Sequence, residues 1–298
     1  MIDAGQVNRL IESQLSAWEQ ARDNYAALSG VKVKTVTMPD GAEFKVQFNP
    51  ARIVSSGAKV DAASLKARPC FLCQANRPAV QEGIAWRGYT ILINPFPIFP
   101  RHLTIPDASH TPQRIAGRIS DMLDLAGELK GYTIFYNGPK CGASAPDHMH
   151  FQAGNSDFLP ITSVTLKQGI EIVGNPNMII LSDSDAGKIA RAFSRLYDML
   201  PVPDGEDEPM MNILCWHDSE AYHLAVIPRH RHRPSFYGTE GDGCMLLSPA
   251  SVDMGRAFIT PREQDFLRLD AGRISSVLDE LCYSDAEIKQ LAEKLKWK

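Results

Sequence analysis

The stretch Cys141-Gly-Ala-Ser-Ala-Pro-Asp-His148-Met-His150-Phe-Gln152 places two imidazoles and a carboxamide at every second residue. If this segment is extended, its side chains alternate between two faces, so that His148, His150 and Gln152 share one face. The intervening Met149 and Phe151 then point into a core. A buried wall of two imidazoles and an amide requires hydrogen-bond partners, which a phosphate or a metal ion would supply. The alternative is a pair of surface histidines on an exposed strand, because isolated His-x-His pairs also occur by accident.

The chain has 298 residues, of which 44% are hydrophobic and 22% are charged, and its formal net charge is -4. This length suits two domains or one duplicated domain. The slightly acidic charge gives no general attraction for a nucleic acid polymer. No apolar stretch is long enough to cross a bilayer, and the N-terminus lacks a basic segment followed by an apolar one. We therefore expect a cytoplasmic protein without a membrane partner.

The hydrophobic periodicity predicts an α+β fold with antiparallel strands and amphipathic helices. We expect helices at residues 3–28, 111–131, 185–200 and 284–296, the last starting with a capping box. We expect strands at residues 31–36, 44–48, 89–93, 103–105, 132–136, 161–166, 178–181, 212–216 and 222–227, with Asp40-Gly41 as a two-residue hairpin turn. The second half loosely repeats the element order of the first, which indicates a duplication with halves at residues 1–160 and 161–298.

The pair Cys70-Phe-Leu-Cys73 has the spacing that lets one loop supply two thiolates to a tetrahedral zinc ion. Because the remaining cysteines stand alone, histidines are the candidates for the other two ligands, and we choose His110 and His148. His102 lies near His110 in the sequence and could replace it. A redox dithiol and a pair of buried structural cysteines are the alternatives.

Several motifs together resemble the galactose-1-phosphate uridylyltransferase branch of the histidine-triad (HIT) superfamily, over residues 68–153. The matching residues, in order, are Cys70-Phe-Leu-Cys73-Gln-Ala-Asn76, Asn94, His110, Asn137-Gly, Gly142-Ala-Ser144 and His148-Met-His150-Phe-Gln152. The last two segments are still more similar to the GDP-hexose phosphorylases, and more loosely to the diadenosine tetraphosphate phosphorylases. The resemblance implies two fused HIT-like halves, each an antiparallel sheet with helices packed on it.

The resemblance also implies roles for individual residues. His150 would attack the α-phosphorus of a nucleotide and form a covalent nucleotidyl-imidazole, and a second acceptor would then displace it. Gln152 would donate to a phosphoryl oxygen, while Ser144 and the Gly142-Ala143 amides would cradle phosphates. Asn94 and Asn137 match nucleotide-contacting positions. For Gln152, Ser144 and the two asparagines, the alternative is an ordinary strand or turn residue.

By the same resemblance Cys70, Cys73, His110 and His148 would bind a structural zinc ion that fixes the backbone beside the nucleophile. We therefore expect a nucleotidyltransferase that moves a nucleoside monophosphate from a nucleotide sugar or dinucleoside polyphosphate to phosphate or a sugar 1-phosphate. A nucleotide-binding regulator without turnover and a hydrolase that uses water are the alternatives. Members of this branch are often dimers, so a homodimer is an open expectation.

Two features of the sequence stay open at this stage. One is the basic run Pro228-Arg-His-Arg-His-Arg-Pro234, which stands where many uridylyltransferases carry a further His-x-His segment. Arg229, Arg231 or Arg233 could meet an acceptor or sugar phosphate, or the run could be a solvated surface strip. The other is the pair His217 and His223, which could hold a second metal or have no such role. The spacing between Ser144 and His148 also exceeds that of the uridylyltransferases by one residue, which leaves the acceptor open.

Overall fold

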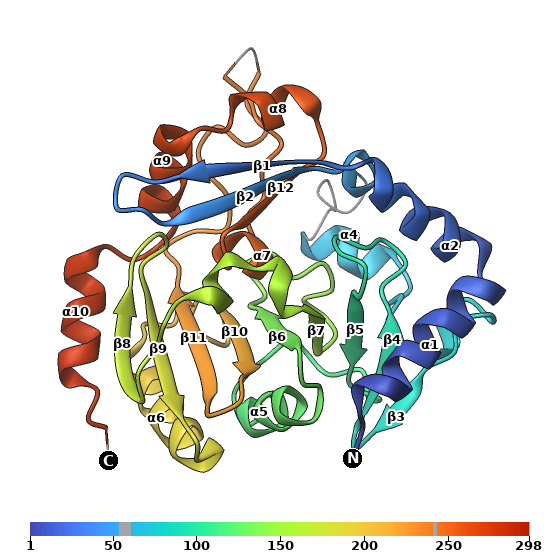
Figure 1. Cartoon of the computed structure of the whole chain (residues 1–298), viewed down its shortest axis with the longest axis horizontal. Coiled ribbons are helices and arrows are strands. Elements are labelled where there is room, and N and C mark those ends of the chain that lie inside the picture. The colour runs from blue at the N-terminus through green and yellow to red at the C-terminus, as the bar shows by residue number, and fades with distance from the viewer. Residues whose placement is uncertain (54–60, 241–242, 298) are drawn as a thin grey trace.

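The computed structural model describes residues 1–53, 61–240 and 243–297, and its centre is a nine-stranded sheet (Figure 1). The strand order is β3-β4-β5-β7-β6-β10-β11-β9-β8, and every neighbouring pair is antiparallel. The strands are β3 (Ile84–Trp86), β4 (Tyr89–Ile93), β5 (Leu103–Pro106), β6 (Tyr132–Asn137), β7 (His150–Asn155), β8 (Gly169–Val173), β9 (Met178–Asp183), β10 (Met211–His217) and β11 (Tyr222–Pro228). The predicted α+β class is therefore confirmed.

The sheet contains the same topology twice. In the first half the spatial order is β4-β5-β7-β6, and in the second it is β8-β9-β11-β10. Each half also has one long helix between its second and third strands, α5 (Ile119–Glu128) in the first and α6 (Ala186–Met199) in the second. The halves join where β6 pairs with β10, so the two repeats of the topology form one continuous sheet.

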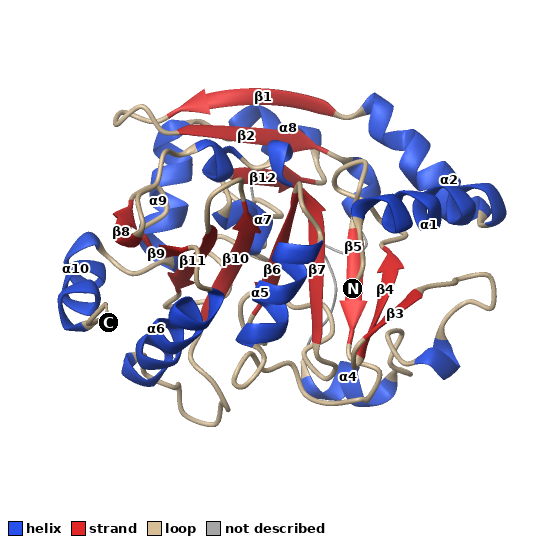
Figure 2. Cartoon of the chain, turned by 60° about the horizontal axis from the view of Figure 1, so that its bottom comes forward, coloured by secondary structure: helices blue, strands red, loops and turns tan. Residues whose placement is uncertain are grey.

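Helices cover one face of the large sheet. Here α5 and α6 pack beside α1 (Ala4–Ala17), α2 (Glu19–Ala26) and α10 (Asp285–Lys294), and their apolar stripes form one core with the strands (Figure 2). A second core fills the opposite face, under the small sheet and three helices, α7 (Ser251–Met254), α8 (Glu263–Arg268) and α9 (Ala271–Leu281). Among the described residues a further helix is α4 (Ala62–Ala67), and short 3-10 helices lie at Ala27–Gly30, Pro50–Arg52, Gln74–Asn76, Ser156–Phe158 and Pro160–Ser163.

The small sheet joins the two ends of the chain. It consists of β1 (Lys32–Thr37), β2 (Glu43–Phe48) and β12 (Ala257–Thr260), and β12 pairs in parallel with β2. Because this pairing crosses residue 160, the division into halves at 1–160 and 161–298 applies to the large sheet and stays a prediction for the chain as a whole. None of the described helices has the length and apolar character needed to cross a bilayer.

Local sequence signals placed most elements correctly. Asp3 and Ser284 cap α1 and α10 with capping boxes, and Asp185 caps α6. The first helix, however, breaks at Trp18, which is extended and buried, so residues 3–28 are not one helix. The predicted two-residue turn at Asp40-Gly41 is also wrong. Met38 and Ala42 close a three-residue loop in which Gly41 has a φ of 85°.

Two other predictions are wrong for reasons of tertiary packing. Residues 161–166 contain a 3-10 helix, and the first strand of the second half is β8. The helix expected from Thr111 begins only at Ile119, because residues 111–118 are held as a loop against the histidine strand. Thr111 accepts a backbone hydrogen bond from Met149 at 2.6 Å, which fixes this loop beside the histidines.

Candidate functional site

His150 is the first residue of β7, and its ring is held in one tautomer. Its Nδ1 lies 2.8 Å from the carbonyl oxygen of His148, so Nδ1 carries the proton and donates. The lone pair is then on Nε2, for which no hydrogen-bond partner is found among the described residues. The side chain is 3% exposed, and burial lowers the pKa of His150 to about 4. The imidazole is therefore neutral at physiological pH.

The alternation predicted for the histidine strand is confirmed from Met149 onward. Met149 and Phe151 are buried in the core on the helical face, so His150 and Gln152 face the opposite side. His148 precedes the strand and lies in a bend, where its ring turns away from His150 toward the two cysteines of the C-x-x-C pair.

Gln113 holds the backbone of the histidine strand, a role that no sequence motif indicated. It is fully buried, and its Oε1 accepts from the His150 amide at 2.7 Å. Its Nε2 donates to the carbonyl oxygens of His150 and Asn137, both at 3.0 Å. The side chain therefore links the ends of β6 and β7, where the ladder of main-chain hydrogen bonds has stopped.

Gln152 is oriented by His102, which like Gln113 has a role that no sequence motif indicated. Nδ1 of His102 accepts from the amide of Ile98 at 3.2 Å, so Nε2 carries the proton and donates to Gln152 Oε1 at 3.0 Å. With its oxygen engaged, the carboxamide of Gln152 presents its NH2 group as the free end. His102 is fully buried, and burial together with the charge of Arg52 lowers its pKa to about 3.

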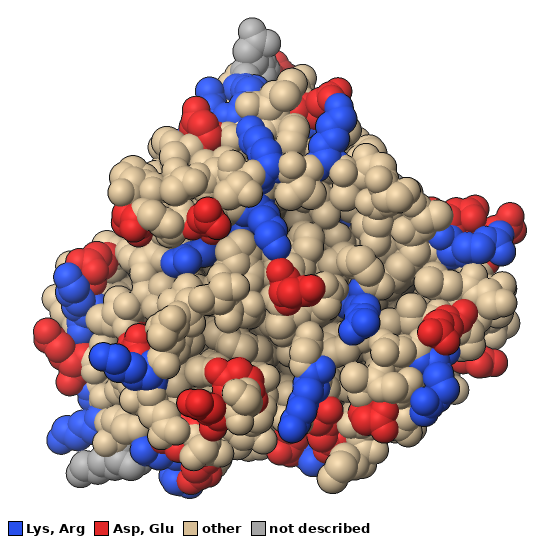
Figure 3. All heavy atoms as spheres, in the orientation of Figure 1, with Lys and Arg blue, Asp and Glu red and all other residues tan. Residues whose placement is uncertain are grey.

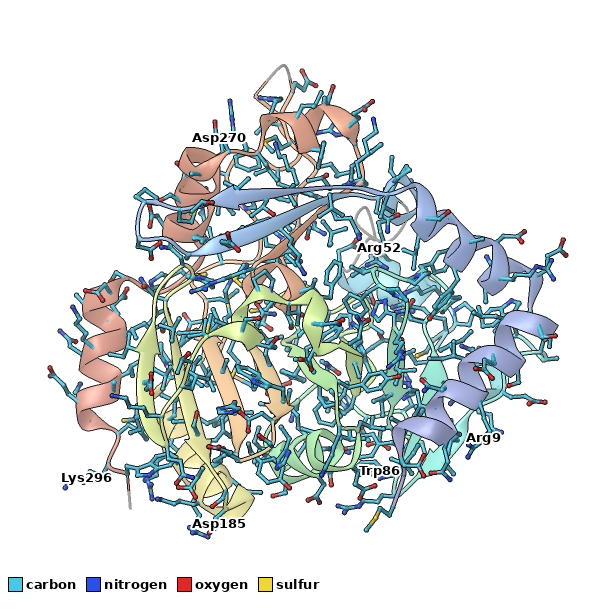
Figure 4. All side chains as sticks on the ribbon, viewed as in Figure 1. Arg9, Arg52, Trp86, Asp185, Asp270 and Lys296 are labelled. Carbon is cyan, nitrogen blue, oxygen red and sulfur yellow. The ribbon has the colours of Figure 1, made fainter. Side chains whose placement is uncertain are left out.

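Asn94 and Arg52 lie beside this pair. Asn94 accepts from the amide of Phe96 at 2.9 Å and donates to Thr104 at 3.1 Å, so most of its hydrogen-bonding capacity is used in the turn. Arg52 comes from the segment after β2, is labelled in Figure 4, and donates to the carbonyl of Phe96 at 2.7 Å. The fold thus brings a cation from the N-terminal hairpin to the His102 and Gln152 pair.

The turn before the histidine strand contains three successive backbone amides without a hydrogen-bond partner in the described chain. Gly142 has a φ of 97°, a conformation that favours glycine, and an added Cβ would lie 2.6 Å from the Cβ of Ala250. Within the described chain, no protein group accepts a hydrogen bond from the amides of Gly142, Ala143 or Ser144. Successive free amides at such a turn form a concave site for an anion.

Asn137 has a different environment from the one the resemblance implies. Its Oδ1 accepts from Asn212 Nδ2 at 3.0 Å, from the amide of Ser251 at 2.8 Å and from the Ser251 hydroxyl. Asn212 also donates to the carbonyl of Cys141 at 2.7 Å. The Asn137 oxygen therefore belongs to a buried network that connects the two halves beneath the turn, and a role in nucleotide contact stays a prediction.

Cys70, Cys73, His110 and His148 come together in one cluster. Their ligand atoms all lie within 4.8 Å of one another. His148 Nδ1 is 3.3 Å from Cys70 Sγ, 3.5 Å from Cys73 Sγ and 3.3 Å from His110 Nδ1, and Cys73 Sγ is 3.2 Å from His110 Nδ1. Tetrahedral zinc with its usual bond lengths separates such atoms by roughly 3.3 to 3.8 Å. The cluster can hold a metal ion.

Hydrogen bonds outside the cluster orient its ligands as a metal requires. His148 Nε2 donates to the carbonyl of Asp107 at 2.9 Å, which leaves the Nδ1 lone pair for the ion. Both cysteines are free thiols. Two sulfur and two imidazole donors form the soft set that suits zinc and leave no position for water.

The alternative histidines lie elsewhere. His102 is engaged with Gln152 and does not replace His110. His223 has both ring nitrogens occupied, by Ser182 and by Asp218, each at 2.8 Å, while His217 packs edge-on against Tyr222. Within residues 1–53, 61–240 and 243–297, the cysteine and histidine cluster is the one group found that could hold a metal.

These features define a class of protein: an α+β chain with a duplicated antiparallel sheet, a neutral histidine on a central strand and a two-cysteine, two-histidine cluster beside it. A family model described as a domain of unknown function (DUF4922) matches residues 10–155, which contain the cluster and His150. No curated protein matches the sequence.

Solved structures of yeast Ap4A phosphorylase Apa2 share the fold. The crystal structure of Apa2 has 18% sequence identity and a TM-score of 0.56, with 89% of this chain and 94% of that chain covered. The structure of Apa2 in complex with AMP has 17% sequence identity and a TM-score of 0.55, with 89% of this chain and 95% of that chain covered. The structure in complex with Ap4A has 15% sequence identity and a TM-score of 0.57, with 89% of this chain and 96% of that chain covered. This likeness extends through both halves and is a likeness of fold.

Proposed function

We propose that this protein is a nucleotidyltransferase that works through a covalent nucleotidyl-His150 intermediate. The observation that carries the proposal is the hydrogen bond from His150 Nδ1 to the His148 carbonyl, because in the neutral ring that burial favours it places the lone pair on Nε2. Such a nitrogen is nucleophilic without a separate base. The fold shared with an Ap4A phosphorylase supports the same reaction class.

In the first step Nε2 of His150 attacks the α-phosphorus of the nucleotide substrate. The P–N bond forms as the P–O bond to the leaving group breaks, and the leaving group departs as a nucleoside polyphosphate or a sugar phosphate. The NH2 group of Gln152, aimed by His102, would donate to a non-bridging oxygen as negative charge develops. The free amides of Gly142, Ala143 and Ser144 would bind the neighbouring phosphate.

In the second step an oxygen of inorganic phosphate attacks the same phosphorus, the P–N bond breaks, and a nucleoside diphosphate leaves. His150 returns to its neutral form with the electron pair on Nε2. We favour phosphate over a sugar phosphate as acceptor because the histidine strand resembles that of the phosphorylases.

The cysteine and histidine cluster would hold a zinc ion in this protein. With four protein ligands, the ion would serve as a structural cross-link between the Cys70 loop, the His110 loop and the bend before His150. His148 would then fix the carbonyl group that selects the tautomer of His150. No substrate position is left on such an ion.

A trapping experiment tests the proposal. Dinucleoside polyphosphates and nucleotide sugars of each base, labelled at the α-phosphorus, should leave an acid-labile, base-stable adduct on the protein. His150→Ala should remove the adduct, and His230→Ala, whose side chain binds Glu287 at the surface, should keep it. The absence of an adduct with every substrate, or its survival in His150→Ala, would overturn the mechanism. Release of nucleoside monophosphate without phosphate would instead identify a hydrolase, and binding without turnover a regulator.

A further inference from the structure

The basic run after β11 divides into two groups of residues. His230 binds Glu287 of α10 at 3.2 Å, and Arg231 forms an ion pair with Glu280 of α9. These two side chains are about half exposed, and each has a carboxylate partner near the surface. On the face shown in Figure 3, basic and acidic side chains are interspersed in the same way.

The other three residues have no carboxylate partner among the described residues. Arg229 is 3% exposed, yet its guanidinium donates only to oxygens without charge: Asn212 Oδ1 at 2.5 Å and the carbonyls of Pro249, Arg231 and His232 at 3.0 to 3.4 Å. Its Nε is buried without a partner. The carboxyl group of Asp253 interacts electrostatically with Arg229, but no hydrogen bond or ion pair joins the two among the described residues, and a buried cation of this kind raises the local potential and favours an anion nearby.

His232 and Arg233 converge on one hydroxyl group. Arg233 Nε donates to Ser248 Oγ at 2.9 Å, and His232 Nε2 lies 3.4 Å from the same oxygen. The guanidinium of Arg233 also stacks over Tyr237, 4.2 Å from the ring centroid, which orients its remaining donors. Burial and the charges of Arg233, Arg229 and Lys140 lower the pKa of His232 to about 3, in keeping with a cationic neighbourhood.

The segment 248–251 lies between Arg229, His232 and Arg233 and the turn at residues 142–144, whose backbone amides have no partner in the described chain. Ser248 contacts Arg233, the carbonyl of Pro249 accepts from Arg229, and Ala250 packs on Gly142. Lys140 stands in the same turn and has one ion pair, with Glu206 at 3.3 Å. Arg229 and Arg233, which have no carboxylate partner among the described residues, therefore contact a segment that packs on the predicted phosphate site.

The separation between the strand of His150 and the strand before Arg229 indicates which phosphate of a substrate Arg229, His232 and Arg233 would bind. β6 and β10 lie between β7 and β11, so that three strand spacings, about 14 Å, separate the strand of His150 from the strand that Arg229 follows. A phosphate that attacks the phosphorus on His150 must touch the reacting group. The separation of the strands therefore favours the far end of a polyphosphate chain, rather than the reacting phosphate, as the ligand of this group.

We propose that Lys140, His232, Arg233 and Ser248 form a distal phosphate subsite, with the buried Arg229 behind it, which binds the terminal phosphates of a substrate or leaving group. This inference rests on the proposed function and narrows it. A chain of several phosphates fills the subsite, whereas the neutral sugar of a nucleotide sugar does not. The second half of the fold would thus select for polyphosphate length.

Equilibrium binding of nucleoside monophosphates and triphosphates to the full chain tests this. In the wild-type protein we expect the triphosphate of the preferred base to bind at least about 10-fold more tightly than the monophosphate, because charge-assisted hydrogen bonds are strong. Arg233→Ala and Ser248→Ala should reduce this ratio several-fold or more, with monophosphate affinity within about 2-fold, and Arg233→Lys should restore part of it. The ratio of triphosphate affinity to monophosphate affinity does not depend on how much of the sample is unfolded, since both ligands bind the same folded fraction.

Arg231→Ala is the matched control, because Arg231 belongs to the same run but is paired with Glu280, and its ratio should equal that of the wild type. An unchanged ratio in Arg233→Ala and Ser248→Ala would overturn the subsite. So would a higher KM for inorganic phosphate with unchanged triphosphate affinity, which would assign these residues to the acceptor. Failure of every nucleotide to bind the wild type would count against the proposed function itself. Tight binding of the monophosphate, with no tighter binding of the triphosphate, would count against the subsite alone.

Discussion

Gln113 and His150 are joined through two hydrogen bonds between the side-chain amide of the first and the backbone of the second. Gln113 Oε1 accepts from the His150 amide at 2.7 Å, and Gln113 Nε2 donates to the His150 carbonyl at 3.0 Å. A single buried carboxamide therefore sets the position of the residue that we propose as the nucleophile, although the two residues are 37 positions apart in the sequence.

Gln113→Ala should destabilise the protein by roughly 2 to 4 kcal/mol, because it leaves buried amide and carbonyl groups without partners. It should also lower the rate of adduct formation under conditions where the protein remains folded. Chemical unfolding and the trapping assay measure the two effects. Gln290→Ala, at an exposed position of α10, is the control and should change neither. Equal losses of stability in the two variants would contradict the role of Gln113.

His102→Phe keeps an aromatic ring in the core but removes the hydrogen bond that orients Gln152. We expect the rate of nucleotidyl transfer to fall about 10-fold to 100-fold, since a hydrogen bond strengthened in the transition state is worth about 1 to 3 kcal/mol. A double-mutant cycle supplies the check. If His102 acts through Gln152, the double variant His102→Phe with Gln152→Ala should be no slower than Gln152→Ala alone. Additive effects would mean that His102 acts independently.

The cluster of Cys70, Cys73, His110 and His148 predicts how much zinc the purified protein contains. The purified protein should contain about one zinc ion per chain, and Cys73→Ser or His110→Ala should lower this content and the melting temperature together. Elemental analysis and thermal unfolding with and without a chelator measure these quantities. Cys244→Ser, a change at a half-buried thiol outside the cluster, should leave both unchanged. Full zinc content in Cys73→Ser would exclude these ligands.

Gly142→Ala should impair the turn before the histidine strand. The left-handed backbone costs roughly 1 to 2 kcal/mol for a residue with a Cβ, and the new Cβ would also meet Ala250 at 2.6 Å. Gly41→Ala separates these effects, because Gly41 has a φ of 85° but open space around it. Both variants should lose some stability, and we expect only Gly142→Ala to weaken phosphate-dependent turnover. Normal turnover in Gly142→Ala would contradict a phosphate-binding role for the turn.

Glu208 makes stability depend on pH. It is 3% exposed, accepts hydrogen bonds from Tyr136 and from the amide of Ile115, and burial raises its pKa from 4.5 to about 7. The folded protein thus retains a proton that the unfolded chain releases above about pH 4.5. The free energy of unfolding should therefore fall between about pH 4.5 and 7, by up to about 3 kcal/mol from this group.

Urea unfolding between pH 5 and 8 measures this dependence. Glu208→Gln should flatten it, while Glu220→Gln at an exposed position should keep the wild-type curve. A wild-type slope in Glu208→Gln would place the pH dependence in another group. The neighbouring residues Asp207 and Glu206 form ion pairs with Arg114 and Lys140, respectively. Glu208 therefore belongs to a loop that connects the second half to the first.

The sequence by itself determined the elements whose signals are local. Capping residues and apolar stripes defined α6 and α10, and alternation of apolar with polar residues defined β1 and β2. An apolar run defined β4, and the C-x-x-C spacing with histidines predicted the cluster. These signals suffice because they depend on neighbours within one or two turns of chain.

Only the tertiary structure decided how distant segments meet. The loop at 111–118 reads as helix, yet Gln113 and the Thr111 carbonyl bind the histidine strand, and those contacts override a local propensity. His102 is one of several histidines in the sequence, and only the adjacent pairing of β5 and β7 brings it to Gln152. The basic run became interpretable for the same reason. Carboxylates from two later helices pair with His230 and Arg231, whereas Arg229 and Arg233 contact the segment 248–251, which packs on the turn of the other half.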